Sequence, residues 1–198
     1  MSTLFLCNNI DMKRKIVIYL NAPITLGFCV ICVIALILQI ITGGASTNLL
    51  FSTYNSSLLN PLTYIRLICH VFGHADINHL LGNLMYILIL GPMLEEKYHD
   101  KLIYVILTTA IVTGVVNNIF FPNTQLLGAS GVVFAFILLS SVTGSSKGIP
   151  VTSILVALLW IGGEIYDMVA VSDSISQLTH IIGGITGLLI GLSFKRNN

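Results

Sequence analysis

The residues of this chain that could do chemistry are a few polar side chains set inside apolar segments. Ser130 stands among glycines in the run LLGASGVVFAF, His180 begins the run HIIGGITGLLIG, and HADINHLLGN contains the pair His79 and Asn83. An imidazole within hydrogen-bonding reach of a hydroxyl makes a base-activated nucleophile. A lone serine among glycines more often marks tight helix packing, so the hypothesis depends on whether these residues share one depth.

The composition indicates which environment surrounds them. The chain of 198 residues is 55% hydrophobic and 9% charged, with a mean hydropathy of +0.93. A soluble domain carries about a quarter charged residues, so the composition predicts an integral membrane protein surrounded by a lipid bilayer. The net charge is +1 and no basic patch lies away from the chain ends, which predicts no nucleic-acid partner. Cys29 and Cys32 form a CxxC inside an apolar stretch, where two small apolar residues are a better interpretation than a redox pair.

Six apolar segments have the length of a membrane helix or of a shorter helix inside a bundle. They are Ile24–Thr42, the segment after His79 to Leu94, Leu102–Phe121, Ala129–Val142, Ile149–Gly163 and Leu178–Phe194. Short connections predict one all-α domain over residues 1–198, with a six-helix membrane core over about residues 23–194. The long first loop, Gly43–Asn78, is too polar to span, and we expect it at the membrane interface.

Basic residues predict the orientation of this bundle. With six spans, all but one of them fall on one side: Lys13, Arg14, Lys15, Lys97, Lys101, Lys147, Lys195 and Arg196. The positive-inside rule then makes both termini cytoplasmic, including the N-terminal segment 1–15, which lacks the order of a secretory signal peptide. The long first loop is therefore an outer loop. Acidic residues are expected in the other outer loops, namely Glu164, Asp167 and Asp173.

Helical rise places the polar residues in one layer. Counted from the basic or acidic residue at the end of each span, Ser130, His180, His79 and Asn83 lie roughly 18 to 25 Å from the cytoplasmic face. His79 and Asn83 are four residues apart and share a helix face. A stripe of small residues permits close backbone approach. Three glycines are therefore expected to let the helices of Ser130 and His180 touch: Gly131, Gly183 and Gly187.

The position of Ser130 at the start of a helix adds a second chemical feature. The first backbone N–H groups of a helix have no partner within it and point toward the residues at its N-terminus. Together with the Ser130 backbone, side chains of His79 and Asn83 could therefore bind an oxyanion that forms on an attacked carbonyl.

At this point GASG, HADINHLLGN and THIIGGITG, in this order, resemble the motifs of the rhomboid intramembrane serine proteases, over about Pro23 to Gly191. The resemblance implies a six-helix rhomboid bundle with a dyad that works without an acid. Ser130 would be the nucleophile and His180 the general base. It assigns the oxyanion to His79 and Asn83, and structural roles to His74 and Glu95.

Two positions depart from the family pattern. Many members have a tyrosine stacked on the base four residues after the serine, and here that residue is Phe134, which keeps the ring and loses the hydroxyl. The first loop often carries Trp-Arg, and here it carries Ile65–Arg66, which puts the anchoring of this loop in doubt. Neither departure removes a reacting group.

Three other functions have to be weighed. An inactive rhomboid-like protein that binds membrane clients would typically lack the serine or the histidine, and this chain has both. His70, His74 and His79 could suggest a metal or haem site, but no HExxH and no third ligand set accompany them, so we expect no metal and no cofactor. A small transporter would show paired charges or broken helices at mid-membrane, and the spans hold almost no charges.

The sequence therefore predicts a protease of single-span membrane proteins, which are cut near the outer leaflet of a cell membrane. A bacterial membrane is the expected location, and an organellar one is the alternative. Residues 160–177 are the predicted gate for the substrate, with Gly162 and Gly163 loosening it. Substrates should carry small or helix-breaking residues near the cut, because an intact helix hides its carbonyls in internal hydrogen bonds.

Overall fold

The computed structural model describes residues 18–143, 148–170 and 174–195, with the side chains of 167–170, 174–176 and 195 left out. Its elements are α1 Pro23–Ile41, α2 Ala45–Leu49, α3 Pro61–Cys69, η1 His70–Phe72, α4 Ile77–Tyr98, α5 Lys101–Phe120, α6 Ser130–Val142, α7 Val151–Ala170 and α8 Ser174–Lys195. The segment 1–15, Lys147, Asp173 and Arg196, which carry part of the predicted charge pattern, lie outside the described residues. The prediction of an all-helical chain is confirmed for the described part.

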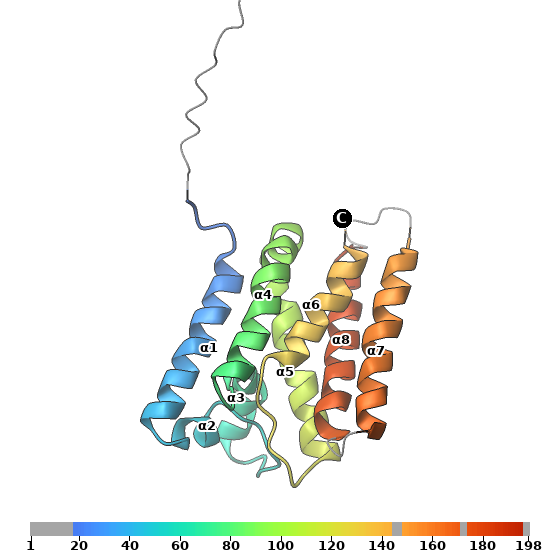
Figure 1. Cartoon of the computed structure of the whole chain (residues 1–198). Helices are drawn as coiled ribbons and strands as arrows, with labels where there is room; N and C mark the ends of the chain where they lie inside the picture. The colour runs from blue at the N-terminus through green and yellow to red at the C-terminus, as the bar shows by residue number, and fades with distance from the viewer. Residues whose placement is uncertain (1–17, 144–147, 171–173, 196–198) are drawn as a thin grey trace, which may run out of the picture.

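The long helices run up and down as one bundle, and α2, α3 and η1 gather at the end where α1 finishes (Figure 1). Among the described residues, four segments are long and apolar enough to cross a membrane: α1, α4, α5 and Gln177–Phe194 of α8. The helix α6 and residues Val151–Tyr166 of α7 are apolar but shorter. At 1.5 Å per residue, the 13 residues of α6 rise only about 20 Å. This helix therefore needs other helices around it, and α4, α5, α7 and α8 all pack on it.

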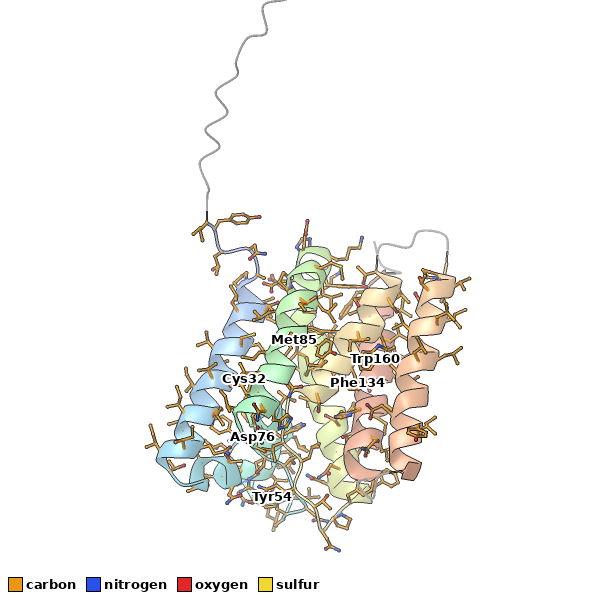
Figure 2. The ribbon with its side chains drawn as sticks, in the orientation of Figure 1. Cys32, Tyr54, Asp76, Met85, Phe134 and Trp160 are labelled. Carbon is orange, nitrogen blue, oxygen red and sulfur yellow. The ribbon has the colours of Figure 1, made fainter. Side chains whose placement is uncertain are left out.

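The outward faces of the bundle are apolar, which fits a lipid environment. On α1, Val30, Ile34 and Ile40 are exposed, while Cys29 and Cys32 point inward and are buried in the core. Water-facing helices carry polar residues on this face. The two cysteines are thus packed as small apolar residues (Cys32 is labelled in Figure 2).

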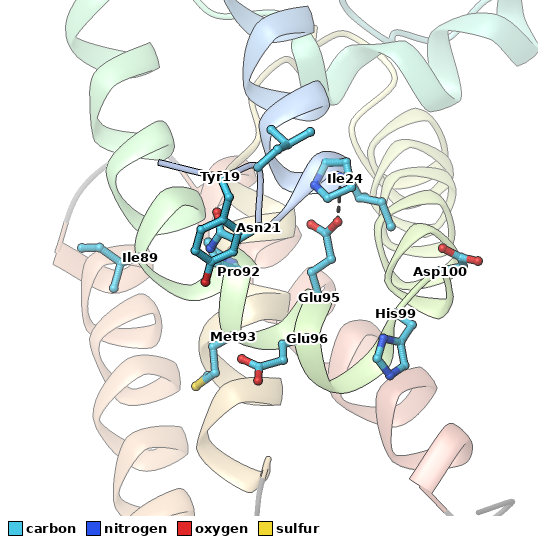
Figure 3. Close-up of a pocket in the computed structure, with 12 residues that line it drawn as sticks. Tyr19, Asn21, Ile24, Ile89, Pro92, Met93, Glu95, Glu96, His99 and Asp100 are labelled. Atoms are coloured by element: carbon cyan, nitrogen blue, oxygen red, sulfur yellow. Dashed lines mark hydrogen bonds between the residues drawn. The ribbon is translucent and has the colours of Figure 1, made fainter. Parts of the chain in front are cut away.

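Glu95 ties the end of α4 to the start of α1. Its carboxylate accepts a hydrogen bond of 2.8 Å from the backbone N–H group of Ile24 (Figure 3). It also accepts bonds of 2.8 Å from the backbone N–H group and the hydroxyl of Thr25. The first N–H groups of a helix have no partner inside it, and a negative charge there also stabilises the helix dipole. Buried Glu95 therefore acts as the cap of α1 from another helix. Next to it, a cavity of about 800 Å³ lies between residues 19–24 and the last turns of α4.

Glycines on α8 set its distance from α6. A Cβ on Gly183 would lie 2.7 Å from the carbonyl oxygen of Gly131, and a Cβ on Gly187 would overlap Ala135. A third glycine, Gly191, meets the side chain of Leu139 in the same way. Matching four-residue steps on both helices keep the two backbones in contact along their length.

The first loop is anchored by buried Arg66. Its guanidinium donates to the Leu49 carbonyl oxygen at 3.1 Å and to the Ser56 hydroxyl at 3.4 Å, and it lies 4.5 Å from the centre of the Tyr54 ring. The doubt about anchoring that Ile65 raised is therefore resolved, because Arg66 makes these contacts by itself.

The same loop holds the segment that leads into α6. Thr53 and Leu126 exchange two backbone hydrogen bonds of 2.8 and 2.9 Å. The backbone N–H of Gly128 also donates to the carbonyl oxygen of His70 at 3.0 Å. These bonds fix the chain two residues before Ser130.

Candidate active site

Ser130 is the first residue of α6. The chain reaches it through Gly128, which has φ +127°, a left-handed conformation that favours glycine. The first backbone hydrogen bond of the helix runs from Val133 N–H to the Ala129 carbonyl oxygen. Ala129 has no side chain that can cap the helix. The N–H groups of the first turn are therefore available for a ligand at the Ser130 side chain.

The structure brings Ser130 and His180 together. The His180 Nε2 atom lies 2.8 Å from Ser130 Oγ, within hydrogen-bonding distance. Both side chains are partly exposed, so the pair is not sealed inside the bundle. The contact joins two helices that the glycines of α8 hold in direct contact, and it has the geometry of a nucleophile and its general base.

Phe134 packs on the imidazole. Its ring is stacked on His180 with centroids 4.6 Å apart and an angle of 11° between the planes. The ring of Trp160 of α7 packs edge-to-face with Phe134, with centroids 5.3 Å apart. Both residues lie between α6 and α7 in Figure 2. Trp160 also meets Tyr86 of α4 at 6.1 Å. Phe134 thus supports one face of the imidazole, as its ring predicts.

The prediction that Glu164 lies in an outer loop is wrong. The helix α7 continues past Gly163 to Ala170, so Glu164 and the backbone of Asp167 are helical. The Glu164 Oε2 atom lies 3.0 Å from His180 Nδ1, and the two side chains are 13% and 17% exposed. An acid therefore stands next to the base, where the resemblance implied a dyad without one.

A signal in the sequence could have found Glu164. Glu164 lies 13 residues after the start of α7, or about 20 Å along the helix. His180 lies at a similar distance from the C-terminal end of α8, which is on the same side of the bundle as the start of α7. Because the two helices are neighbours, the depth argument used for Ser130 applies equally to Glu164. The hydropathy pattern alone ends this span before Glu164, because a charge normally marks the end of an apolar segment.

His79 lies near Ser130, and Asn83 follows it one turn later on α4. A Cβ on Gly128 would be 2.9 Å from His79 Nε2 and 3.8 Å from Ser130 Oγ, so the imidazole edge and the hydroxyl flank this glycine. Asn83 is buried, and its Nδ2 has no hydrogen-bond partner among the described residues. A buried amide without a partner is costly, which marks this donor as one that a ligand could satisfy.

The other two histidines of this region are buried in the protein. The Nδ1 atom of His70 is hydrogen-bonded to the Arg66 carbonyl oxygen, and its Nε2 atom lies 3.4 Å from the Thr113 hydroxyl. His74 has Nδ1 on the Phe72 carbonyl oxygen and its ring against His79. Burial lowers the pKa of each to about 4, and His79 contributes at His74, so both are neutral near pH 7. Within the described part of the chain, no three His, Cys, Asp or Glu side chains cluster as metal ligands.

Comparison with known proteins agrees with this picture. The family model described as "Rhomboid domain" matches residues 61–197. The proteins named "Rhomboid protease GlpG" of Yersinia pestis (strain Pestoides F) and of Yersinia pseudotuberculosis serotype O:3 (strain YPIII) are 32% identical over 183 residues. That of Yersinia enterocolitica serotype O:8 is 29% identical over the same length. Each alignment covers 89% of this chain and 64% of the relative, so the chain spans less than two thirds of the length of these curated proteins.

Proposed function

Because the chain belongs to the rhomboid family, we propose that it is an intramembrane serine endopeptidase that cleaves transmembrane segments of other membrane proteins. The observation that carries this proposal is the 2.8 Å contact between His180 Nε2 and Ser130 Oγ. The relatives named as rhomboid proteases support it.

The reaction begins when the Ser130 oxygen attacks the carbonyl carbon of the scissile peptide. The electron pair of the carbonyl moves to its oxygen, and the hydroxyl proton passes to His180 Nε2. As the intermediate collapses, the C–N bond breaks and the same proton goes to the leaving amine. Water then hydrolyses the acyl-enzyme, again with His180 as the base.

The oxyanion of this intermediate needs donors on the side opposite the base. The backbone N–H groups at the start of α6 supply some of them. The buried Asn83 Nδ2 lacks a partner and His79 borders Gly128, so both side chains are suited to add to this set. Phe134 holds the imidazole plane through its stacked ring.

In the membrane, the proposal includes six spans with both termini in the cytoplasm. The alternating direction of α1, α4, α5, α6, α7 and α8 supports this arrangement (Figure 1). The short helix α6 can be a span because its neighbours bury it. The helix α7 has 20 residues, a rise of about 30 Å, and an exposed apolar face that suits lipid. The first loop and the start of α6 then face the outer side, and water enters from there. A bacterial cell membrane is the proposed location, since the similar proteins come from bacteria.

Substrates are proposed to be single-span proteins that enter laterally and unwind near the outer leaflet. The gate is the region 160–177, of which 171–173 lie outside the described residues. Gly162 and Gly163 are exposed, and a Cβ on either would meet nothing within 4 Å, so neither glycine is held by a neighbouring helix. A helix that can open and close in this way is suited to admit a substrate helix.

The alternative, an inactive rhomboid-like protein that binds clients without cutting them, is less well supported. Such a protein has no need of a hydroxyl and an imidazole at hydrogen-bonding distance.

The test is cleavage of a single-span reporter by purified protein in detergent. We expect cleavage by the natural chain and its loss in Ser130→Ala and in His180→Ala, with no effect of a metal chelator. Ser141→Ala, which alters a hydroxyl later on the same helix, is the matched control and should remain active. Cleavage that survives both dyad substitutions would contradict the proposal.

A further inference from the structure

We propose that Glu164 is the positioning residue of the catalytic base: it accepts a hydrogen bond from His180 Nδ1–H and so orients the base toward Ser130. This inference rests on the proposed protease function and deepens it. It assigns a role to a residue that the motifs do not include and that the hydropathy pattern placed in a loop.

The contact itself decides the tautomer of the imidazole. The Glu164 Oε2 atom is 3.0 Å from Nδ1, and the Ser130 hydroxyl is 2.8 Å from Nε2. An ionised carboxylate can only accept hydrogen bonds, so Nδ1 must carry the hydrogen that lies between them. In the neutral ring, Nε2 then has its lone pair free for the proton of Ser130. Glu164 of α7 thereby holds His180 in the tautomer that can accept the proton of Ser130 on α6.

The carboxylate also stabilises the charge that appears during catalysis. When Nε2 takes the Ser130 proton, His180 becomes an imidazolium with Glu164 beside it. The Glu164 and His180 side chains are only 13% and 17% exposed, so solvent screens this attraction less than it does at a surface. Glu164 acts in this role as a hydrogen-bond acceptor, as in serine protease triads where the acid does not take the proton.

An ionisable residue on an apolar helix is costly, which argues that this one is present for a reason. Such residues usually face the bundle interior and mark functional positions. Glu164 lies just after Gly162 and Gly163, two positions with open space around them. If α7 moves to admit a substrate, the orientation of His180 depends on whether α7 returns. The ion pair thus couples the proposed gate to the base.

Among the described residues, the titratable side chains shown to interact with His180 are Glu164 and His79. On α7, Glu164 contacts it; Tyr166 is exposed, and the side chain of Asp167 lies outside the described residues. On α4, His79 is close enough to interact with it electrostatically. The titratable residues of α5, Lys101 and Tyr104, meet Phe194 near the other end of α8. The helix α6 contributes no charged group.

The test compares Glu164→Gln with Glu96→Gln, the same change at an exposed position near the end of α4. For Glu164→Gln we expect kcat for reporter cleavage to fall about ten- to a hundredfold. The neutral amide does not stabilise the imidazolium and does not fix the tautomer of His180. KM and the thermal midpoint should change little.

Three further measurements separate positioning from mere packing. Glu164→Asp keeps the charge and should recover part of kcat. Covalent labelling of Ser130 by a fluorophosphonate, which needs no substrate helix, should slow in Glu164→Gln in step with kcat. By NMR, the Nδ1–H proton of His180 should resonate well downfield in the natural protein and move upfield in Glu164→Gln.

The outcomes distinguish this inference from the proposed function. An inactive natural protein with Ser130 unreactive would defeat the proposed function and the role of Glu164 with it. An active natural protein whose Glu164→Gln variant has the same kcat and the same Nδ1–H resonance would defeat only the role of Glu164. Loss of thermal stability in Glu164→Gln with unchanged kcat per folded molecule would assign the contact between Glu164 and His180 to structure alone.

Discussion

Gly183 of α8 lies directly against the backbone of Gly131 on α6. A Cβ at Gly183 would be 2.7 Å from the Gly131 carbonyl oxygen and 2.8 Å from its Cα. The neighbour of Gly131 is Ser130, and His180 precedes Gly183 by less than one helical turn. This backbone contact between the two helices therefore lies beside the point at which the hydroxyl and the imidazole meet.

Gly183→Ala should weaken both the fold and the reaction. The added methyl meets backbone, which cannot move aside as a flexible side chain can, so we expect the free energy of unfolding in detergent to fall by about 1 to 3 kcal/mol. The control is Gly162→Ala on α7, where the methyl meets nothing within 4 Å. There, stability should stay constant or rise by up to about 1 kcal/mol, because alanine favours a helix. Equal losses in the two variants would show that the contact is not tight.

Asn83→Ala should reduce catalysis without a matching loss of stability. Its buried Nδ2 has no partner among the described residues, whereas one lost oxyanion donor lowers kcat by about a hundredfold. Asn117→Ala is the opposite case, since Asn117 donates to Asn118 and accepts from Thr124. We expect it to lower the thermal midpoint while kcat per folded molecule is kept. An Asn83→Ala variant with natural kcat would remove Asn83 from the oxyanion site.

Phe134→Leu should slow cleavage by loosening the imidazole. A stacked aromatic pair contributes about 0.5 to 1.5 kcal/mol beyond its buried area, so kcat should fall about three- to tenfold with KM nearly constant. Phe134→Tyr keeps the ring and should retain natural kcat. The measurement is steady-state cleavage of the reporter; an unaffected leucine variant would mean that the stack is not needed to hold His180.

Glu95→Ala should detach α1 from α4. Three hydrogen bonds of 2.8 Å to one buried carboxylate are lost, and we expect a cost of about 3 kcal/mol in the free energy of unfolding. Glu96 is the next residue and is exposed, so Glu96→Ala should change stability by less than about 0.5 kcal/mol. A Glu95→Ala variant as stable as Glu96→Ala would contradict the capping role.

The bundle and the reacting pair could be predicted because both follow from simple repeats. Hydropathy locates the long helices, and the rise per residue puts Ser130 and His180 at one depth. The glycine at every fourth position of α8 indicates which helix is the neighbour. In the described part of the chain, these features agree with the helix bounds to within a few residues, except at α7.

Glu164 and Arg66 could not be placed in this way, because their environment depends on tertiary contacts. A charge normally ends an apolar span, and only the partner on α8 explains why α7 continues past Glu164. In the first loop, the buried position of Arg66 depends on carbonyl and hydroxyl groups 17 and 10 residues away. No periodic pattern records such contacts.

The central claim is that His180 makes the Ser130 hydroxyl a nucleophile, and covalent labelling with a fluorophosphonate tests it most directly. Mass spectrometry of the folded protein should find the adduct on Ser130, with Ser140 and Ser141 of the same helix unmodified, and the adduct should disappear in His180→Ala. A folded protein without an adduct at Ser130, or one labelled equally well without His180, would contradict the claim.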